Sequence, residues 1–239
     1  MEKILFLADI HGNMPALRAI EKEIEHIRPD QIWFVGDAVG KGPEGDKAVD
    51  WVRSHCNRFV KGNWDDGVCR NFEDRKYPEH AFYYEQLGEE RVRWLDRLPL
   101  EEEVLISGMK IRVLHGRPAD RLFQAFDTWE EMAEGFTSKL TGKTFDTYIC
   151  ADSHMPYVRA CGLGYAVNTG SVGNSLGYPR AHALLVEGDL DHEEKTPIYF
   201  QILSVPYDNE EAIRIAESYA DFPNLWAYSN EIRTGTYSR

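Results

Sequence analysis

The chain has 239 residues, enough for one large domain or two small ones with a sizeable core. Its 40 acidic and 27 basic residues give a formal net charge of −13, which argues against general nucleic-acid binding but allows a local basic pocket for a phosphate. No apolar run approaches the roughly 18 residues of a membrane span, the first strand begins too early for a signal peptide, and the four cysteines show no C-x-x-C spacing. We therefore expect a cytoplasmic protein with reduced thiols.

The first part of the chain predicts alternating strands and helices. The apolar run over residues 4–8 is typical of a strand buried on both faces, and apolar side chains at helical spacing predict a helix over residues 15–28. Further strands are predicted at residues 32–35 and 58–61, with a second helix between them. This alternation predicts βαβ units and a parallel sheet.

The middle of the chain has a different composition. Residues 66–99 are charged and aromatic, with helical periodicity that Gly88 interrupts, and we interpret them as a helical excursion beside the site. A hairpin is predicted over residues 103–114, a helix near residues 129–140, and a strand at residues 147–150.

The last part of the chain predicts closely spaced strands and a final helix. The strands are expected near Val158, near Ala166, at residues 183–186 and at residues 198–205. Asp208 and Glu211 form a capping box for a helix that runs through Tyr219. Since the sequence shows no internal repeat or linker, we expect a single domain over residues 1–239.

Side chains that can bind metal follow five of the predicted strands. They are Asp9 with His11, Asp37, Asn63, His115, and Asp152 with His154. Open α/β sheets place their sites beyond the carboxyl ends of strands, and side chains two apart in an extended chain point the same way. Each residue alone has an ordinary explanation as a helix cap, a turn residue or a buried histidine. Five such strand ends together favour a metal site.

The same residues form an ordered set of motifs. In chain order these are D-x-H (Asp9, His11), G-D (Gly36, Asp37), G-N-x-D (Gly62, Asn63, Asp65), H-G (His115, Gly116) and a terminal x-x-H ending at His154. The set resembles the calcineurin-like metallophosphoesterases over most of the chain. The segments at residues 8–13, 39–43 and 168–173 resemble the small prokaryotic branch of predicted phosphodiesterases.

The resemblance implies an α/β fold, a four-layer α/β/β/α sandwich of two mixed sheets flanked by helices. It also implies two divalent transition-metal ions, with manganese favoured by family habit over iron, zinc, nickel or cobalt. Carried across by position, one ion takes Asp9, His11, Asp37 and His154. The other takes Asp37, Asn63, His115 and Asp152, so that Asp37 bridges the two. Two cations roughly 3.5–4 Å apart clamp a phosphoryl group and acidify a bridging water.

Two positions depart from the family pattern. Asp152 stands where a histidine is usual, so it either ligates with harder, more negative surroundings or turns away and leaves a weak second site. Trp64 stands where fully equipped members carry a histidine that assists the leaving group. Its presence limits the mechanism without excluding hydrolysis.

The function that the resemblance implies is hydrolysis of phosphate esters, with diesters favoured, by a metal-bridging hydroxide and with Asp37, Asn63 and His115 at the reaction centre. The alternatives are a phosphomonoesterase, of protein-phosphatase or dinucleoside-polyphosphatase type, and a non-catalytic scaffold such as the retromer subunit of this fold. The partner expected is a small phosphate-ester substrate, and the oligomeric state is left open. Candidates to hold its phosphate, for each of which a solvated surface residue is the favoured interpretation, are Asn13, Lys41, Arg117 and Arg180.

Overall fold

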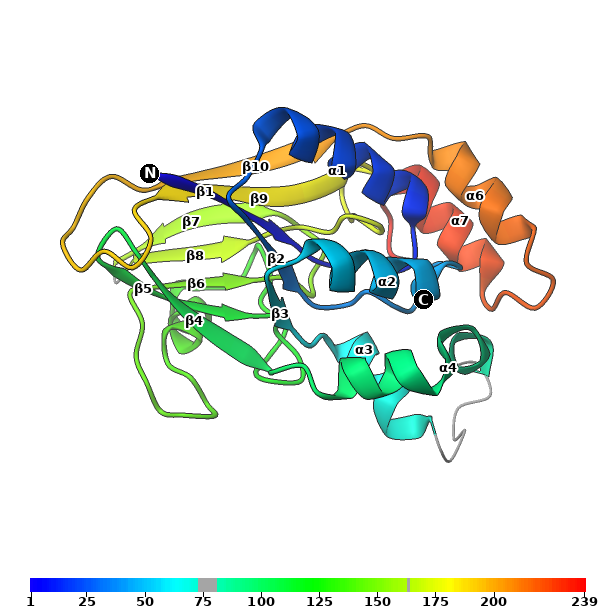
Figure 1. Cartoon of the computed structure of the whole chain (residues 1–239), viewed down its shortest axis with the longest axis horizontal. Helices are drawn as coiled ribbons and strands as arrows, with labels where there is room; N and C mark the ends of the chain where they lie inside the picture. Colours follow the sequence, from blue (N-terminus) through cyan, green and yellow to red (C-terminus); the bar gives the residue numbers. More distant parts are fainter. Residues whose placement is uncertain (73–80, 163) are drawn as a thin grey trace.

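The computed structural model describes residues 1–72, 81–162 and 164–239, which form two sheets packed face to face (Figure 1). The strand order is β10-β9-β1-β2-β3 in the first sheet and β4-β5-β6-β8-β7 in the second. The strands of the first sheet are β1 (Glu2–Leu7), β2 (Gln31–Val35), β3 (Arg58–Val60), β9 (Ala181–Gly188) and β10 (Tyr199–Val205). Those of the second are β4 (Glu101–Ile106), β5 (Met109–Leu114), β6 (Thr147–Cys150), β7 (Tyr157–Cys161) and β8 (Gly164–Asn168).

Both sheets are mixed. In the first, β1, β2 and β3 are parallel, and β9 and β10 extend the sheet with antiparallel pairing. In the second, β5, β6 and β8 are parallel, and β4 and β7 are antiparallel edge strands. The predicted metal-binding residues follow parallel strands of both sheets, so the carboxyl ends of these strands carry the candidate site.

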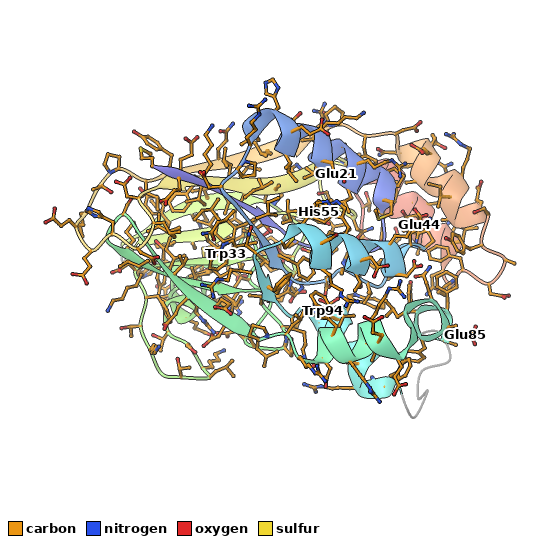
Figure 2. All side chains as sticks on the ribbon, in the orientation of Figure 1. Glu21, Trp33, Glu44, His55, Glu85 and Trp94 are labelled. Atoms are coloured by element: carbon orange, nitrogen blue, oxygen red, sulfur yellow. The ribbon has the colours of Figure 1, made fainter. Side chains whose placement is uncertain are left out.

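Apolar side chains from both sheets fill the space between them. Phe6 of β1 is in register with Trp33 of β2, and their ring centroids are 5.4 Å apart. Trp33, labelled in Figure 2, belongs to the same buried cluster as Val113 and Ile149 of the second sheet. Burying each such side chain contributes about 1.5–3 kcal/mol, which holds the two sheets, and therefore their strand ends, in a fixed relation.

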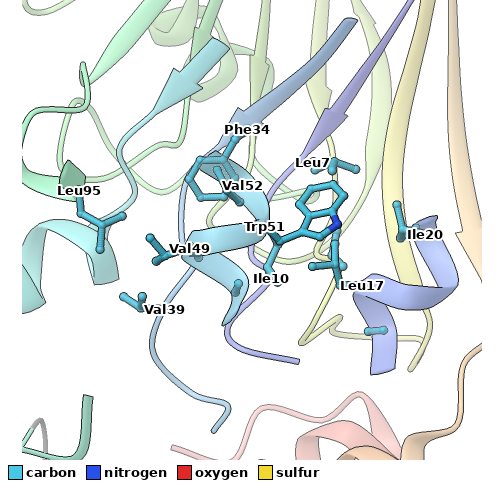
Figure 3. Close-up of a cluster of buried hydrophobic side chains, with 14 of the residues drawn as sticks. Leu7, Ile10, Leu17, Ile20, Phe34, Val39, Val49, Trp51, Val52 and Leu95 are labelled. Atoms are coloured by element: carbon cyan, nitrogen blue, oxygen red, sulfur yellow. The ribbon is translucent and has the colours of Figure 1, made fainter. Parts of the chain in front are cut away.

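Helices cover the outer faces of both sheets and complete the four layers. Leu17 of α1 and Trp51 of α2 pack with Leu7 and Phe34 on the outer face of the first sheet (Figure 3). The outer face of the second sheet packs through Tyr148 against the segment that contains α5. The bounds are α1 Met14–Ile27, α2 Gly45–His55 and α5 Trp129–Ala133. The predicted four-layer sandwich of two mixed sheets is confirmed.

The predicted helical excursion contains α3 (Asn63–Asn71) and α4 (Ala81–Asp96), while residues 73–80 lie outside the described part of the chain. The expected interruption at Gly88 is confirmed, because this residue has φ +67° and breaks the helical geometry of α4. That left-handed value is accessible to glycine at little cost.

Two helix predictions were wrong in extent. The helix expected near residues 129–140 ends at Ala133 with a short 3-10 turn after it, because Ser138 Oγ accepts the N–H groups of Leu140 and Thr141 and folds that stretch into a turn. The helix capped by Asp208 is confirmed as α6 (Asn209–Glu217), but it is not the final one. A further helix, α7 (Leu225–Thr234), follows it and packs against it through a small apolar cluster.

Among the helices in the described ranges, none is both long and apolar enough to cross a bilayer.

Candidate metal centre

Five of the predicted ligands meet in one buried cluster. They fall into two overlapping groups, Asp9 with His11 and His154, and Asp9 with Asp37 and His115, in each of which the ligand atoms lie within 4.8 Å of one another. Asp9, His11 and Asp37 follow β1 and β2 of the first sheet, whereas His115 and His154 follow β5 and β6 of the second. The cluster therefore spans the two sheets at their carboxyl ends.

The D-x-H pairs converge for a reason other than the one expected. β1 ends at Leu7 and β6 at Cys150, so neither pair lies in an extended strand. Instead, left-handed φ values between +49° and +64° occur at Asp9, His11, Asp37, Asp152 and His154. Each such residue costs roughly 1–2 kcal/mol relative to ordinary backbone. Strained non-glycine residues gather at functional sites, so their concentration here independently marks the cluster as one.

Backbone hydrogen bonds fix the loops that carry the carboxylates. Asp9 N–H donates to the carbonyl of Gly36 at 2.8 Å, and His11 N–H donates to the carbonyl of Asp37 at 3.1 Å. The glycine of the G-N motif is required by packing, because a Cβ at Gly62 would lie 2.1 Å from Asp37 Oδ1. The close approach at Gly62 and the hydrogen bonds between the loops thus hold Asp37 next to the end of β3.

The three imidazoles all present Nε2 to the cluster. Each donates from Nδ1 to a backbone carbonyl: His11 to Val39 at 2.8 Å, His115 to Val35 at 2.7 Å and His154 to Asn174 at 2.5 Å. This anchoring fixes the tautomer and orientation, as is typical of metal-binding histidines. The Nε2 atoms of His11 and His154 lie 3.2 Å apart, so two lone pairs face each other unless a cation or a proton lies between them.

The carboxylates lie between imidazoles of the two sheets. Asp37 Oδ2 is 3.6 Å from His11 Nε2 and 3.4 Å from His115 Nε2, while its Oδ1 accepts the N–H of Trp64 at 2.8 Å. Asp9 Oδ1 is 3.2 Å from His154 Nε2 and 3.7 Å from His115 Nε2. Asp9 therefore shares with Asp37 the central position that the family resemblance implied for Asp37 alone.

Several ligand-type atoms of the cluster are buried without a hydrogen-bond partner in the described structure. These atoms are both carboxylate oxygens of Asp9, Oδ1 of Asn63 and Nε2 of His115. Leaving buried polar groups unpaired costs roughly 1–3 kcal/mol each. Divalent transition metals bind carboxylate and amide oxygens and imidazole nitrogens through their lone pairs. The residues present therefore fit such ions.

The electrostatics of the cluster favour positive charge at its centre. Burial alone would raise the pKa of Asp9, but the imidazoles of His154 and His115 outweigh it and hold that pKa well below its usual range. Burial likewise disfavours the charged form of His115, yet Asp37 and Asp9 raise its pKa well above the ordinary value. The buried carboxylates and imidazoles thus stabilise each other's charged forms, and the two carboxylates favour a cation beside them.

Asp152 and Arg117, predicted as a metal ligand and a phosphate binder, are joined to each other. Arg117 donates from its guanidinium to Asp152 at 2.7 and 2.8 Å and from its backbone N–H at 3.1 Å. Asp152 is buried, whereas about half of the Arg117 side chain is exposed. Accordingly, Asp152 is in neither three-residue group of the cluster.

The other predicted phosphate binders have different surroundings. Asn13 is fully buried and caps α1, and its amide donates to Gly173 O at 2.7 Å and to Tyr207 Oη at 3.3 Å. Both amide N–H bonds of Asn13 are used within the protein, and its role in holding phosphate stays a prediction. Arg180 stacks over the exposed ring of Tyr178 at 4.9 Å.

Trp64 borders the cluster as an aromatic wall. Its ring meets that of His11 edge-on, with centroids 6.2 Å apart, and a Cβ at Gly40 would lie 2.3 Å from the indole. Burial, together with the charge of Asp37, raises the pKa of the neighbouring Asp65 to about 7. Both Asp65 oxygens, however, accept backbone N–H groups, including those of Asp37 at 2.8 Å and Ala38 at 3.0 Å. This carboxyl therefore stabilises the loop that follows β2.

The sequence did not indicate Asn174, whose carbonyl anchors His154, or Glu231 on α7, which accepts a hydrogen bond from the Asn174 amide at 3.0 Å. Asn174 directly follows the segment at residues 168–173, one of the segments that carry the family resemblance. Glu231 carries no such signal, because it lies in a helix that sequence periodicity missed.

Two facing mixed sheets with carboxylates and imidazoles gathered at their parallel strand ends define a metal-binding α/β sandwich. The model of the calcineurin-like phosphoesterase superfamily domain matches residues 2–191, and the chain belongs to this superfamily. An uncharacterized protein of Methanocaldococcus jannaschii is 28% identical over 162 residues, covering 66% of this chain and 64% of that protein.

Two further relatives extend the comparison. A symmetrical bis(5'-nucleosyl)-tetraphosphatase of Erwinia tasmaniensis is 29% identical over 114 residues, covering 42% of this chain and 41% of that enzyme. The chain thus spans less than two thirds of the length of both curated relatives. A metallophosphoesterase structure from Sphaerobacter thermophilus superposes with a TM-score of 0.73 at 22% identity, covering 98% of this chain and 99% of the other, which shows a shared fold.

Proposed function

We propose that this protein hydrolyses phosphodiesters with two divalent transition-metal ions, manganese being favoured. The observation that carries the proposal is the buried cluster of two carboxylates and three anchored imidazoles, in which both Asp9 oxygens and His115 Nε2 lack hydrogen-bond partners within the described protein. Such a cluster is unfavourable by itself and becomes favourable when cations occupy it. The superfamily to which the chain belongs is one of phosphoesterases.

The proposed ligands divide into two sets, one for each metal ion. His11 and His154 with Asp9 would hold one ion, His115 and Asn63 the other, and Asp37 would contact both. When bound, the ions would activate water and neutralise the charge that develops on the phosphoryl group. The backbone anchors at Nδ1 keep the imidazoles directed at the ions, and the indole of Trp64 limits access of bulk water beside His11.

Asp152 completes the second site in this proposal despite its contact with Arg117. The guanidinium of Arg117 contacts both Asp152 oxygens, but about half of the arginine side chain is exposed, so solvent screens its attraction for the carboxylate. Binding a metal ion at a four-ligand protein site is worth roughly 10–16 kcal/mol in total, so a metal ion can compete with the arginine for this carboxylate. Arg117 can also keep one carboxylate oxygen while the other binds metal, in the manner of a supporting hydrogen bond.

Elemental analysis of Asp152→Ala tests this assignment. We expect the variant to retain one equivalent of metal where the wild type holds two, because the second site loses its carboxylate. Arg117→Met is the matched control, since it removes the ion pair and keeps Asp152. Two equivalents in Asp152→Ala would exclude Asp152 as a ligand.

The specific observation that favours a second candidate is the likeness to the tetraphosphatase of Erwinia tasmaniensis. That enzyme's name indicates action on dinucleoside tetraphosphates, and the same metal centre can serve either chemistry. Trp64 makes this candidate less favoured, because it leaves out the histidine expected to protonate a leaving group. A non-catalytic scaffold is less favoured still, since it would have no use for the strained, buried cluster.

The activity can be tested on protein stripped of metal and reloaded with Mn²⁺, Zn²⁺ or Mg²⁺. Bis(p-nitrophenyl) phosphate, p-nitrophenyl phosphate and diadenosine tetraphosphate represent the diester, the monoester and the dinucleotide. We expect manganese-dependent turnover, fastest with the diester. Higher kcat/KM for either other substrate would replace the diester assignment, and absence of turnover with every metal would favour the scaffold.

A further inference from the structure

Lys41 is a buried ammonium close to the cluster and without a carboxylate at contact distance. It lies four residues after Asp37 in the loop between β2 and α2, and its side chain is 6% exposed. Its Nζ donates to Asn174 Oδ1 at 3.1 Å, and no carboxylate oxygen in the described ranges lies within 4.0 Å of it. Lys61, which is equally buried, is by contrast 3.4 Å from Asp96 Oδ1 and 3.8 Å from Asp66 Oδ1.

The ammonium of Lys41 is also in electrostatic range of the metal-site carboxylates. Burial lowers the pKa of Lys41, while the charges of Glu231, Asp9 and Asp37 act in the opposite direction. Asn174, which accepts its hydrogen bond, is the residue whose carbonyl anchors His154. Lys41 is therefore linked to a histidine of the cluster through a single residue.

The position of Lys41 is fixed from α7. Glu231, 1% exposed, accepts the Asn174 amide at 3.0 Å, the backbone N–H of Ser238 at 3.0 Å and the Nε of Arg239 at 3.3 Å. Arg239 in turn donates to the carbonyl of Lys41 at 3.3 Å. The ring of Tyr237 lies over the ammonium at 5.5 Å. These contacts come from residues beyond the segment that the superfamily model matches.

An unpaired buried ammonium is unfavourable unless an anion completes it. An ammonium offers three N–H donors, and the described residues accept only one of them in a hydrogen bond. The anion that must reach this place, if the cluster acts as proposed above, is the phosphate group of the substrate. The carboxylates of the cluster would be occupied by metal, which leaves Lys41 free to bind a phosphate oxygen.

We propose that Lys41 binds a non-bridging phosphate oxygen of the substrate and that Glu231, acting through Asn174, is the positioning residue that holds Lys41 toward the cluster. The inference rests on the proposed function for the identity of the anion. It assigns to the C-terminal helix a part in substrate binding, supplied by residues outside the matched domain. Lys41 would then complement the metal ions in phosphate recognition.

Binding of inorganic phosphate to the manganese-loaded protein, measured by calorimetry, tests the inference without relying on turnover. We expect Lys41→Met to weaken phosphate binding by roughly 10–100-fold, the range for a hydrogen bond to a charged group, while two metal equivalents are retained. Lys41→Arg should restore part of the affinity. Lys47→Met is the control, because Lys47 is a mostly exposed lysine on α2 paired with Glu44.

The positioning role has its own readout. Glu231→Gln keeps the shape and removes the charge, so we expect KM for the aryl diester to rise more than kcat falls, with unchanged metal content. Phosphate affinity unchanged in Lys41→Met, whether or not its melting temperature falls, would overturn the proposal. Lys41-dependent phosphate binding in a wild type that hydrolyses no diester would support this inference while rejecting the proposed reaction.

Discussion

At the scale of single residues, the cluster concentrates features that oppose folding. Five non-glycine residues with left-handed backbone each cost roughly 1–2 kcal/mol, and the carboxylate of Asp9 is buried without a hydrogen-bond donor. The Nε2 atoms of two anchored imidazoles, those of His11 and His154, are 3.2 Å apart, so their lone pairs repel each other in the absence of a proton or cation. Bound cations would offset these costs, so the arrangement of these residues favours the metal-loaded protein over the metal-free one.

Asp37 is the residue whose charge matters to both proposed ions. Asp37→Asn is nearly isosteric, so we expect cooperative unfolding to persist while kcat/KM falls by roughly 10³-fold or more in metal-saturated protein. The measurement is steady-state hydrolysis of an aryl diester with metal content determined in parallel. Asp50→Asn, on the surface of α2 in an ion pair with Arg91, is the matched control. Near-normal turnover in Asp37→Asn would rule out a shared bridging carboxylate.

Trp64 sets an expectation for leaving groups. A positioned general acid contributes about 10²–10⁴-fold, and an indole N–H is too weakly acidic to provide it. Asp65 is not placed to provide it either, because both of its oxygens accept backbone N–H groups. We therefore expect the rate to depend steeply on leaving-group pKa, with aryl diesters cleaved readily and alkyl diesters slowly. A graded diester series on the wild type and on Trp64→His measures this, and a flat wild-type dependence would reveal another acid.

At the scale of elements, the positions of the strands could be predicted from the sequence, but the conformation of the loops that follow them could not. Buried parallel strands such as β1 and β2 leave continuous apolar runs, and their order with the intervening helices fixes the parallel part of the first sheet. The local patterns do not encode the left-handed turns that orient Asp9 and His11, because Asp and His, although enriched in such backbone, adopt it in only a minority of cases. They also do not encode the Arg117–Asp152 pair, which depends on the packing of two loops.

The two helix errors have a similar origin. The end of α5 depends on Ser138 competing for backbone N–H groups, which apolar spacing does not register. The helix α7 buries a short face on α6 and was missed because its apolar periodicity is weak. Because α7 was not predicted, Glu231 and its place in the Lys41 network were not predicted either.

His182 joins β9 to neighbouring segments and makes stability depend on pH. Its Nδ1 lies 2.6 Å from Ser175 Oγ and its Nε2 lies 3.1 Å from Ser204 Oγ of β10. Burial, with a smaller effect of Arg180, lowers the pKa of His182 to about 4. The folded state thus disfavours the proton, so this contribution to stability is complete above the unfolded pKa near 6.5 and is lost as the pH falls toward 4.

Denaturant unfolding of wild type and His182→Asn at pH 7 and pH 5 measures this effect. From the lowered pKa we expect wild-type stability to fall by about 2 kcal/mol more than that of His182→Asn over this interval. Comparing the two proteins cancels the titration of groups they share. Equal losses in both would show that His182 carries a proton in the folded state as easily as in the unfolded chain.

At the scale of the whole molecule, removing metal should lower stability. An ion at 100 times its Kd stabilises the folded state by roughly 2.7 kcal/mol, which for a protein of this size corresponds to about 5–10 °C in melting temperature per site. We expect chelation to lower Tm by at least this amount, and readdition of Mn²⁺ to restore it. A Tm that is insensitive to chelation in protein shown to have lost its metal would mean that the cluster is not the binding site.

The division of the ligands between two sheets has a mechanical consequence. Asp9, His11 and Asp37 follow strands of one sheet, and His115 and His154 follow strands of the other. Bound ions would therefore act as non-covalent cross-links between the halves of the sandwich, and the halves could not part without breaking coordination bonds. The rate at which bound metal exchanges with an isotope in solution would then set an upper limit on how often the two sheets separate, a motion that ordinary unfolding experiments average away.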